Sequence, residues 1–233
     1  MEEELSEDGN LKKAFELLKM GDTKKALELY DDVLDQNPSN FDALINKSLT
    51  LIQARRFKES LKCLESISHD SPYGFDKMLI EATCFYSLNQ REKAQELYTK
   101  VSNVIPPDRA AILQIGSKCL EQSFFRTSIE IFSKLDDKQS KFEKNYLLGL
   151  SYKGLGELTN SIRSFGVALR AKPDFYQLYP ITAATCFQNN MLDEGDKIMN
   201  ILKDEHNALF QHVAAVVSFY RIDSTKESES INP

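Results

Sequence analysis

Three prolines recur at a fixed interval in the first half of the chain. Pro38, Pro72 and Pro106 each lie 34 residues apart. A period in the range of about 20–50 residues is typical of repeat proteins, in which each unit packs mainly on its neighbours. The interval therefore predicts an array of 34-residue units, provided that other positions keep the same phase.

Small residues keep that phase. When the units open at Glu7, Phe41, Phe75 and Arg109, the eighth and twentieth places carry only alanine, serine or glycine, and the twenty-fourth carries an aromatic residue or leucine. The members are Ala14, Ser48, Ala82 and Gly116 at the eighth place, Ala26, Ser60, Ala94 and Ser128 at the twentieth, and Tyr30, Leu64, Tyr98 and Phe132 at the twenty-fourth. Two helices approach closely only where side chains are small. Each unit is therefore predicted to be a pair of antiparallel helices.

The phase continues through two more units. The fourth unit is one residue short, and the pattern resumes from Phe142 with L-G-x-x-Y, a small residue, an aromatic residue and proline, at Leu148, Gly149, Tyr152, Ser161, Phe165 and Pro173. We expect units at 7–40, 41–74, 75–108, 109–141, 142–175 and 176–207. An acidic tail at 1–6 precedes them, and a capping helix at 208–222 and a disordered, Ser/Glu-rich tail at 223–233 follow.

The residues at the fifteenth place of the units form a further column of the repeat pattern, which predicts the turns inside the units. The fifteenth places are Gly21, Arg55, Asn89, Ser123, Gly156 and Asn190. Four of these six are glycine or asparagine, the residues that best tolerate the left-handed conformation at a helix C-terminus. We therefore expect each first helix to end in a left-handed turn.

On these residues the chain resembles tetratricopeptide repeat (TPR) proteins over residues 7–221. It departs from their pattern at the fourth place, which holds Asn10, Leu44, Met78 and Ile112 instead of an aromatic residue, and it contains no tryptophan. The resemblance implies an all-α fold: a right-handed α-solenoid of about six TPR hairpins plus a C-terminal capping helix. It also implies a concave groove, lined by the first helices, that binds a peptide or a helix of a partner protein.

The residues that this arrangement would turn into the groove are mostly apolar. They are Ile45, Asn46, Leu49, Leu79, Ile80, Tyr86, Leu113, Gln114, Tyr146, Leu150, Ile181 and Phe187. An apolar groove suits an amphipathic helix or an extended segment with apolar anchors. We therefore expect a non-enzymatic scaffold or adaptor. A chaperone that shields a hydrophobic client, a regulatory subunit of an enzyme complex and a homodimer that uses the same surface are alternatives. The same side chains could instead pack within the array.

One known use of a TPR groove is disfavoured. Chaperone-binding members of the family hold an acidic C-terminal peptide with a clamp of Lys, Asn and Arg, and of these residues only Asn46 matches here. Leu11, Asp76 and Ile80 occupy the places of the clamp's cations. The carboxylate of Asp76 would repel the carboxylates of such a peptide. The basic cluster from Arg55 to Lys62 is interpreted as surface ion-pairing positions, or else as a local docking patch.

Charge and motifs exclude other classes of function. A formal net charge of −6 disfavours a nucleic-acid partner, because binding to a phosphate backbone depends on Lys and Arg. Three histidines occur, without an HExxH or GxSxG motif or a glycine-rich phosphate loop, so we expect no enzyme, no metal and no cofactor.

The cysteines and the apolar runs bear on the cellular location. The four cysteines fall within helical apolar patterns, which favours buried thiols over two disulfides. The first residues do not form a secretory signal, and the longest apolar runs are too short to cross a bilayer, so we expect a cytoplasmic protein without membrane insertion.

Overall fold

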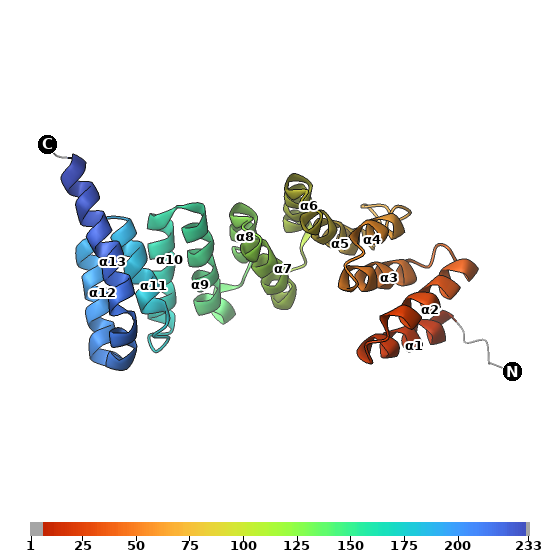
Figure 1. The fold of residues 1–233 in the computed structure, drawn as a ribbon, viewed down its shortest axis with the longest axis horizontal. Coiled ribbons are helices and arrows are strands. Elements are labelled where there is room, and N and C mark those ends of the chain that lie inside the picture. Colours follow the sequence, from red (N-terminus) through yellow and green to blue (C-terminus); the bar gives the residue numbers. More distant parts are fainter. Residues whose placement is uncertain (1–6, 232–233) are drawn as a thin grey trace. The chain divides into compact units, whose positions relative to one another are not determined.

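The computed structural model describes residues 7–231, except for the side chains at 137, 139 and 222–231. Within this range the chain forms thirteen α-helices and no strand (Figure 1). Two compact units can be distinguished, Met1–Ile105 and Pro106–Pro233. The predicted acidic tail at 1–6 and the last two residues of the predicted disordered tail lie outside the described residues.

The N-terminal unit consists of three helical hairpins. Its helices are α1 (Glu7–Lys19), α2 (Thr23–Gln36), α3 (Phe41–Gln53), α4 (Phe57–Cys63), α5 (Gly74–Ser87) and α6 (Arg91–Val104). From α1 to α6, each helix packs against the next one along the chain. In addition, α3 packs against α5, the first helix of the following hairpin. The start of α3 is capped by Asn40, whose Oδ1 accepts the backbone N–H of Ala43 at 2.9 Å. Consecutive hairpins thus stack as the sequence period predicts.

The C-terminal unit contains three hairpins and a last helix. Its helices are α7 (Arg109–Glu121), α8 (Phe125–Phe132), α9 (Asp137–Leu155), α10 (Leu158–Ala171), α11 (Leu178–Gln188), α12 (Leu192–Glu205) and α13 (Asn207–Ile231). Helix α9 is kinked at Ser140, where φ is −131°. The kink falls at the end of the shortened fourth repeat. The first three residues of α9 therefore belong to the connection after α8, and the rest of α9 forms the first helix of the fifth hairpin.

The small residues at the eighth and twentieth places are buried in every repeat. They let the two helices of a hairpin approach, and in two hairpins a serine also joins them: Ser60 Oγ donates to the carbonyl oxygen of Ser48 at 2.9 Å, and Ser161 Oγ to that of Gly149 at 2.8 Å. The twenty-fourth-place rings fill the space alongside and are buried; they are Tyr30, Tyr98, Phe132 and Phe165. The predicted hairpin packing is confirmed at these contacts.

The predicted left-handed turns are also confirmed. All six residues of the fifteenth-place column have positive φ, including Arg55 at 60° and Ser123 at 61°. Each turn carries the same pair of backbone hydrogen bonds, as where Arg55 N donates to Ile52 O at 2.9 Å and Arg56 N to Leu51 O at 2.8 Å. This is the Schellman motif, which satisfies the last carbonyl groups of a helix.

The last helix differs in part from the prediction. Helix α13 packs on α11 and α12 and buries Val217 against them, as expected of a cap. However, it continues to Ile231 and so includes residues 223–231, for which the sequence predicts a disordered tail. Extension of an existing helix needs no new nucleus, and this polar segment has no proline or glycine before Pro233 to stop it.

All four cysteines are free thiols, in agreement with the expectation. Cys84, Cys119 and Cys186 are buried, and Cys63 is half-buried. Burial raises the pKa of the Cys119 thiol to about 12 and that of Cys186 to about 11, because a thiolate is poorly solvated among apolar side chains. These thiols therefore act as core residues.

We predict opposite effects for two glycine substitutions inside helices. A Cβ at Gly149 would lie 2.3 Å from the buried ring of Phe165, so Gly149→Ala should lower the free energy of unfolding by about 1–2 kcal/mol. A Cβ at Gly166 meets only Arg170 Nη1, at 3.6 Å, so Gly166→Ala should raise it by up to about 1 kcal/mol. Urea unfolding followed by circular dichroism measures both, and equal effects of the two substitutions would contradict the packing described here.

A second prediction concerns the turn at Arg55. An arginine at φ 60° is strained, whereas asparagine adopts this conformation readily. Arg55→Asn should therefore stabilise the protein by about 0.5–1 kcal/mol in the same measurement. Asn89→Arg, the reverse change at the next turn, should destabilise it, and a stabilising Asn89→Arg would show that strain does not govern these turns.

Candidate functional site on the first helices

The residues that were predicted to line the groove lie on the first helices of five hairpins. Most are partly or fully accessible: Asn46, Leu49, Tyr86 and Gln114 are exposed, and Ile45, Leu79, Leu113, Tyr146, Leu150 and Ile181 are half-buried. Each compact unit presents its own set of these side chains.

In the N-terminal unit, each first helix exposes one large apolar side chain. These are Phe15 on α1, Leu49 on α3 and Tyr86 on α5, with exposed fractions of 57%, 45% and 36%. We call these three residues the apolar row. Phe15 was not among the predicted groove residues, although it occupies the same ninth place as Leu49. It would have been found if the ninth place of the first repeat had been counted among the groove residues.

Two predicted groove residues are wrong, because they belong to the core. Ile80 is only 3% exposed and packs in a cluster with Leu64 and Ile67 of the preceding repeat. Phe187 is 1% exposed, and its ring lies where a Cβ at Gly195 would stand. Each points toward a neighbouring helix rather than to solvent, so neither can contact a partner in this conformation.

In the C-terminal unit, the predicted groove residues mainly contact one another and the core. The ring of Tyr146 lies 5.9 Å from that of Phe142 and 5.8 Å from that of Phe175. Leu150 and Ile181 pack at the edge of the cluster around Phe165. In this unit the alternative of packing within the array therefore accounts for much of the apolar surface.

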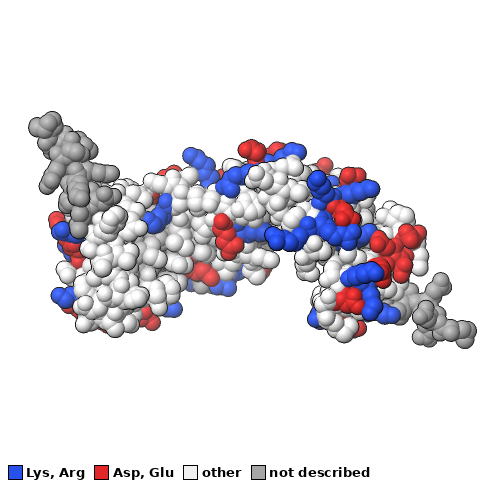
Figure 2. Space-filling model, viewed as in Figure 1, with Lys and Arg blue, Asp and Glu red and all other residues white. Residues whose placement is uncertain are grey.

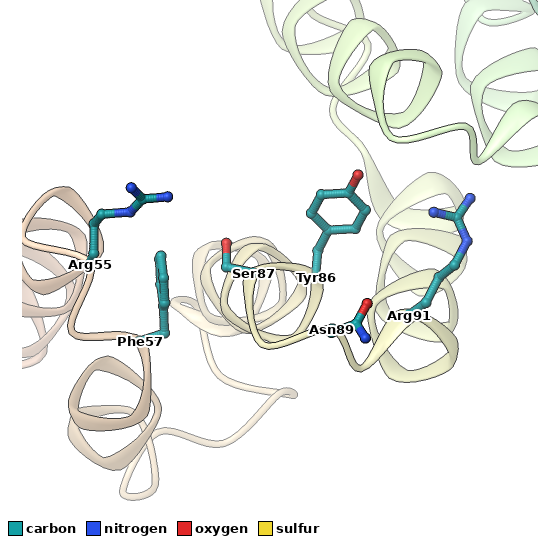
Figure 3. A pocket seen from close by; sticks show the side chains of 6 residues that line it. All are labelled: Arg55, Phe57, Tyr86, Ser87, Asn89 and Arg91. Carbon is teal, nitrogen blue, oxygen red and sulfur yellow. The ribbon is translucent and has the colours of Figure 1, made fainter.

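A cleft of about 450 Å³ opens where α3 and α5 end, next to Tyr86 of the apolar row. It is lined by Arg55, Phe57, Tyr86, Ser87, Asn89 and Arg91 (Figure 3). In that view Arg55 and Arg91 stand on opposite sides of Tyr86 and Ser87, and both guanidinium groups project from the same side of the helices as the Tyr86 hydroxyl. We refer to this site as the arginine cleft.

In the N-terminal unit, acidic residues stand at the starts of the first helices, and two arginines stand near the ends of α3 and α5. Asp8, Asp42 and Asp76 occupy the second place of successive repeats, where they complement the positive ends of the helix dipoles. Burial raises the pKa of Asp76. At the other end lie the two arginines of the cleft. On the face drawn in Figure 2, Lys and Arg side chains lie over the N-terminal unit together with Asp and Glu side chains.

The basic cluster from Arg55 to Lys62 separates into two surfaces. Arg56 is bound by Glu59, with Nε and Nη2 donating to the carboxylate at 2.7 and 2.6 Å, and so forms a surface ion pair as predicted. Arg55, one residue earlier, lies in the arginine cleft instead. The left-handed turn at Arg55 directs these neighbours to different surfaces.

No helix within residues 7–231 is both long and apolar enough to cross a membrane. This agrees with the short apolar runs noted in the sequence.

Two curated proteins are similar to parts of the chain. The phagocyte signaling-impaired protein of Drosophila pseudoobscura pseudoobscura is 30% identical over 88 residues, which cover 38% of this chain and 9% of that protein. The CTR9 homolog of Arabidopsis thaliana is 27% identical over 128 residues, which cover 54% of this chain and 12% of that protein. The chain thus matches about a tenth of the length of these relatives.

Among solved structures, a tetratricopeptide repeat protein from Parabacteroides merdae has a TM-score of 0.58 to this chain at 16% identity, and the match covers 97% of this chain and 93% of that one. At this identity the likeness shows the fold. A TPR fold is generally non-enzymatic and suggests a scaffold for protein–protein interaction. The family described as the Psidin N-terminal TPR repeats region matches residues 8–141, more than half of the sequence. The chain is therefore a TPR protein that belongs to the Psidin N-terminal TPR repeat family.

Proposed function

We propose that this protein is a non-enzymatic scaffold that binds a segment of a partner protein along the apolar row. The observation that supports this most directly is the exposure of Phe15, Leu49 and Tyr86, one from each of three successive first helices. Exposed aromatic and aliphatic side chains at one surface are typical anchors of protein interfaces.

The spacing of the apolar row suits a peptide or an amphipathic helix. Packed helices lie about 8–10 Å apart, and α3 packs against α5, so we expect a spacing of roughly that size between Leu49 and Tyr86. Two turns of an α-helix advance about 11 Å, and three extended residues advance about 10 Å. Apolar residues seven apart in a helix, or three apart in an extended segment, can therefore meet Leu49 and Tyr86.

The free thiols support a location in a reducing compartment. Disulfides persist in oxidising compartments and are rare in the cytosol. The four free thiols are therefore consistent with the cytoplasmic scaffold that we propose. A scaffold retains its partner in a finished complex, which distinguishes it from a chaperone that releases its client.

We predict that Phe15→Glu with Leu49→Glu strongly weakens peptide binding without unfolding the protein. Both side chains are about half exposed, so the substitutions cost little packing, but they place two carboxylates among the apolar anchors of the partner. Peptides are first selected on the full wild-type chain from a phage-displayed library of random linear peptides. The affinity of the selected peptides is then measured for the wild type and for the double variant. We expect selected peptides to lose about ten-fold or more in affinity for the double variant.

The control is Val104→Glu at the end of α6, because Val104 is 57% exposed, as is Phe15, but lies on a second helix. It should leave peptide binding unchanged. The proposal fails if no peptide is selected on the wild-type chain, or if the double variant binds the selected peptides as well as Val104→Glu does.

A further inference from the structure

We propose that the arginine cleft selects partner segments in which acidic residues flank an apolar residue. The apolar residue would pack on Phe57 and Tyr86, and the flanking carboxylates would meet Arg55 and Arg91. This inference rests on the proposed function and deepens it, because it specifies the chemistry of the partner segment beside its apolar anchors.

The composition of the cleft supports this assignment. Phe57 and Tyr86 contribute aromatic surface, and Ser87 and the Tyr86 hydroxyl contribute polar groups between the two arginines (Figure 3). A guanidinium group presents a planar fork of N–H donors that matches a carboxylate, and such charged hydrogen bonds are stronger than neutral ones. An acidic residue next to an apolar one satisfies both kinds of surface at once.

The placement of the arginines favours two carboxylates over one phosphate. Arg55 belongs to the turn after α3, whereas Arg91 begins α6, and the two stand on either side of Tyr86 and Ser87 (Figure 3). Two cations on opposite walls of a cleft suit charges that are spaced along a peptide. The net charge of −6 of the chain further disfavours a nucleic acid as the occupant.

The distribution of charge also sets the register of the partner. Asp8, Asp42 and Asp76 stand near the starts of the first helices, where they repel carboxylates. The arginines stand near the ends of α3 and α5. An acidic segment is therefore favoured only near the ends of α3 and α5. The acidic-tail clamp, which the sequence disfavours, would lie at other positions.

The backbone at Arg55 gives independent support. The fifteenth place requires positive φ, and glycine or asparagine stands there in four of the six repeats. Arginine at φ 60° is a strained choice. Residues that break a local rule of the fold are expected at functional sites, and the side chain of Arg55 projects into the cleft (Figure 3).

The test uses the same random peptide library on the full wild-type chain and on the Arg55→Asn, Arg91→Gln double variant. We expect Asp and Glu to be enriched on both sides of an apolar residue in peptides selected on the wild type, and this enrichment to disappear on the double variant. Arg126→Gln with Arg163→Gln, which removes two exposed charges from the C-terminal unit, is the matched control and should retain the enrichment.

A binding titration then measures the charge contribution directly. The most enriched peptide, labelled with fluorescein, should lose about ten-fold or more in affinity when its Asp and Glu are replaced by Asn and Gln, and also when sodium chloride is raised. Arg55→Asn alone should weaken binding of the acidic peptide while it raises the melting temperature. Loss of binding through unfolding would lower the melting temperature instead.

Three outcomes would overturn the inference. Selected peptides that are apolar without acidic enrichment would show that the cleft has no such preference, while the proposed function would stand. An enrichment that persists on the double variant would place the acidic contact elsewhere. A phosphoserine peptide that binds more tightly than its Asp and Glu counterparts would show that the cleft is a phosphate site. If no peptide is selected at all, the proposed function itself fails.

Discussion

The fold depends on the close approach of two helices over a residue with almost no side chain. In three hairpins this residue is glycine, and an added Cβ would collide with a phenyl ring: Gly116 with Phe132, Gly149 with Phe165 and Gly195 with Phe187. Elsewhere alanine or serine takes this role. Since the ring occupies the volume that a larger residue would need, each hairpin has one way to pack. Every repeat that keeps this contact then presents its first helix in the same orientation.

That repetition explains why the exposed side of the first helices is free to vary. The buried side of each helix is restricted to small residues and the rings that cover them, whereas the other side is not needed for packing. In the N-terminal unit this side carries Phe15, Leu49 and Tyr86, which are large and apolar although they contribute little to the core. Single exposed apolar side chains are common on protein surfaces, and it is their recurrence on three successive first helices that supports the proposed binding.

The sequence predicts the repeats well because they rest on positions where steric limits favour only a few residue types. Period, small columns and left-handed turns all follow from steric limits that can be read at fixed spacings. The site is harder to predict. Ile80 and Asn46 both lie on the accessible side in an idealised repeat, but Ile80 is buried because the α4–α5 connection brings Ile67 against it. Side chains of irregular connections leave no periodic signal, and the extension of α13 beyond 222 leaves none either.

The left-handed turns connect the fold with the binding specificity that we propose. A Schellman turn fixes the backbone through its two hydrogen bonds and its positive φ, but it leaves the side chain of the turn residue outside the packed interface. Glycine or asparagine minimises backbone strain there. An arginine at this place therefore lowers the stability of the fold, but it adds a cation beside the apolar row. Arg91 stands two places after the next turn, at the start of a second helix, where the backbone is again fixed. Two charges can thus be held at defined positions without any change in the core, which allows one repeat architecture to recognise different partners.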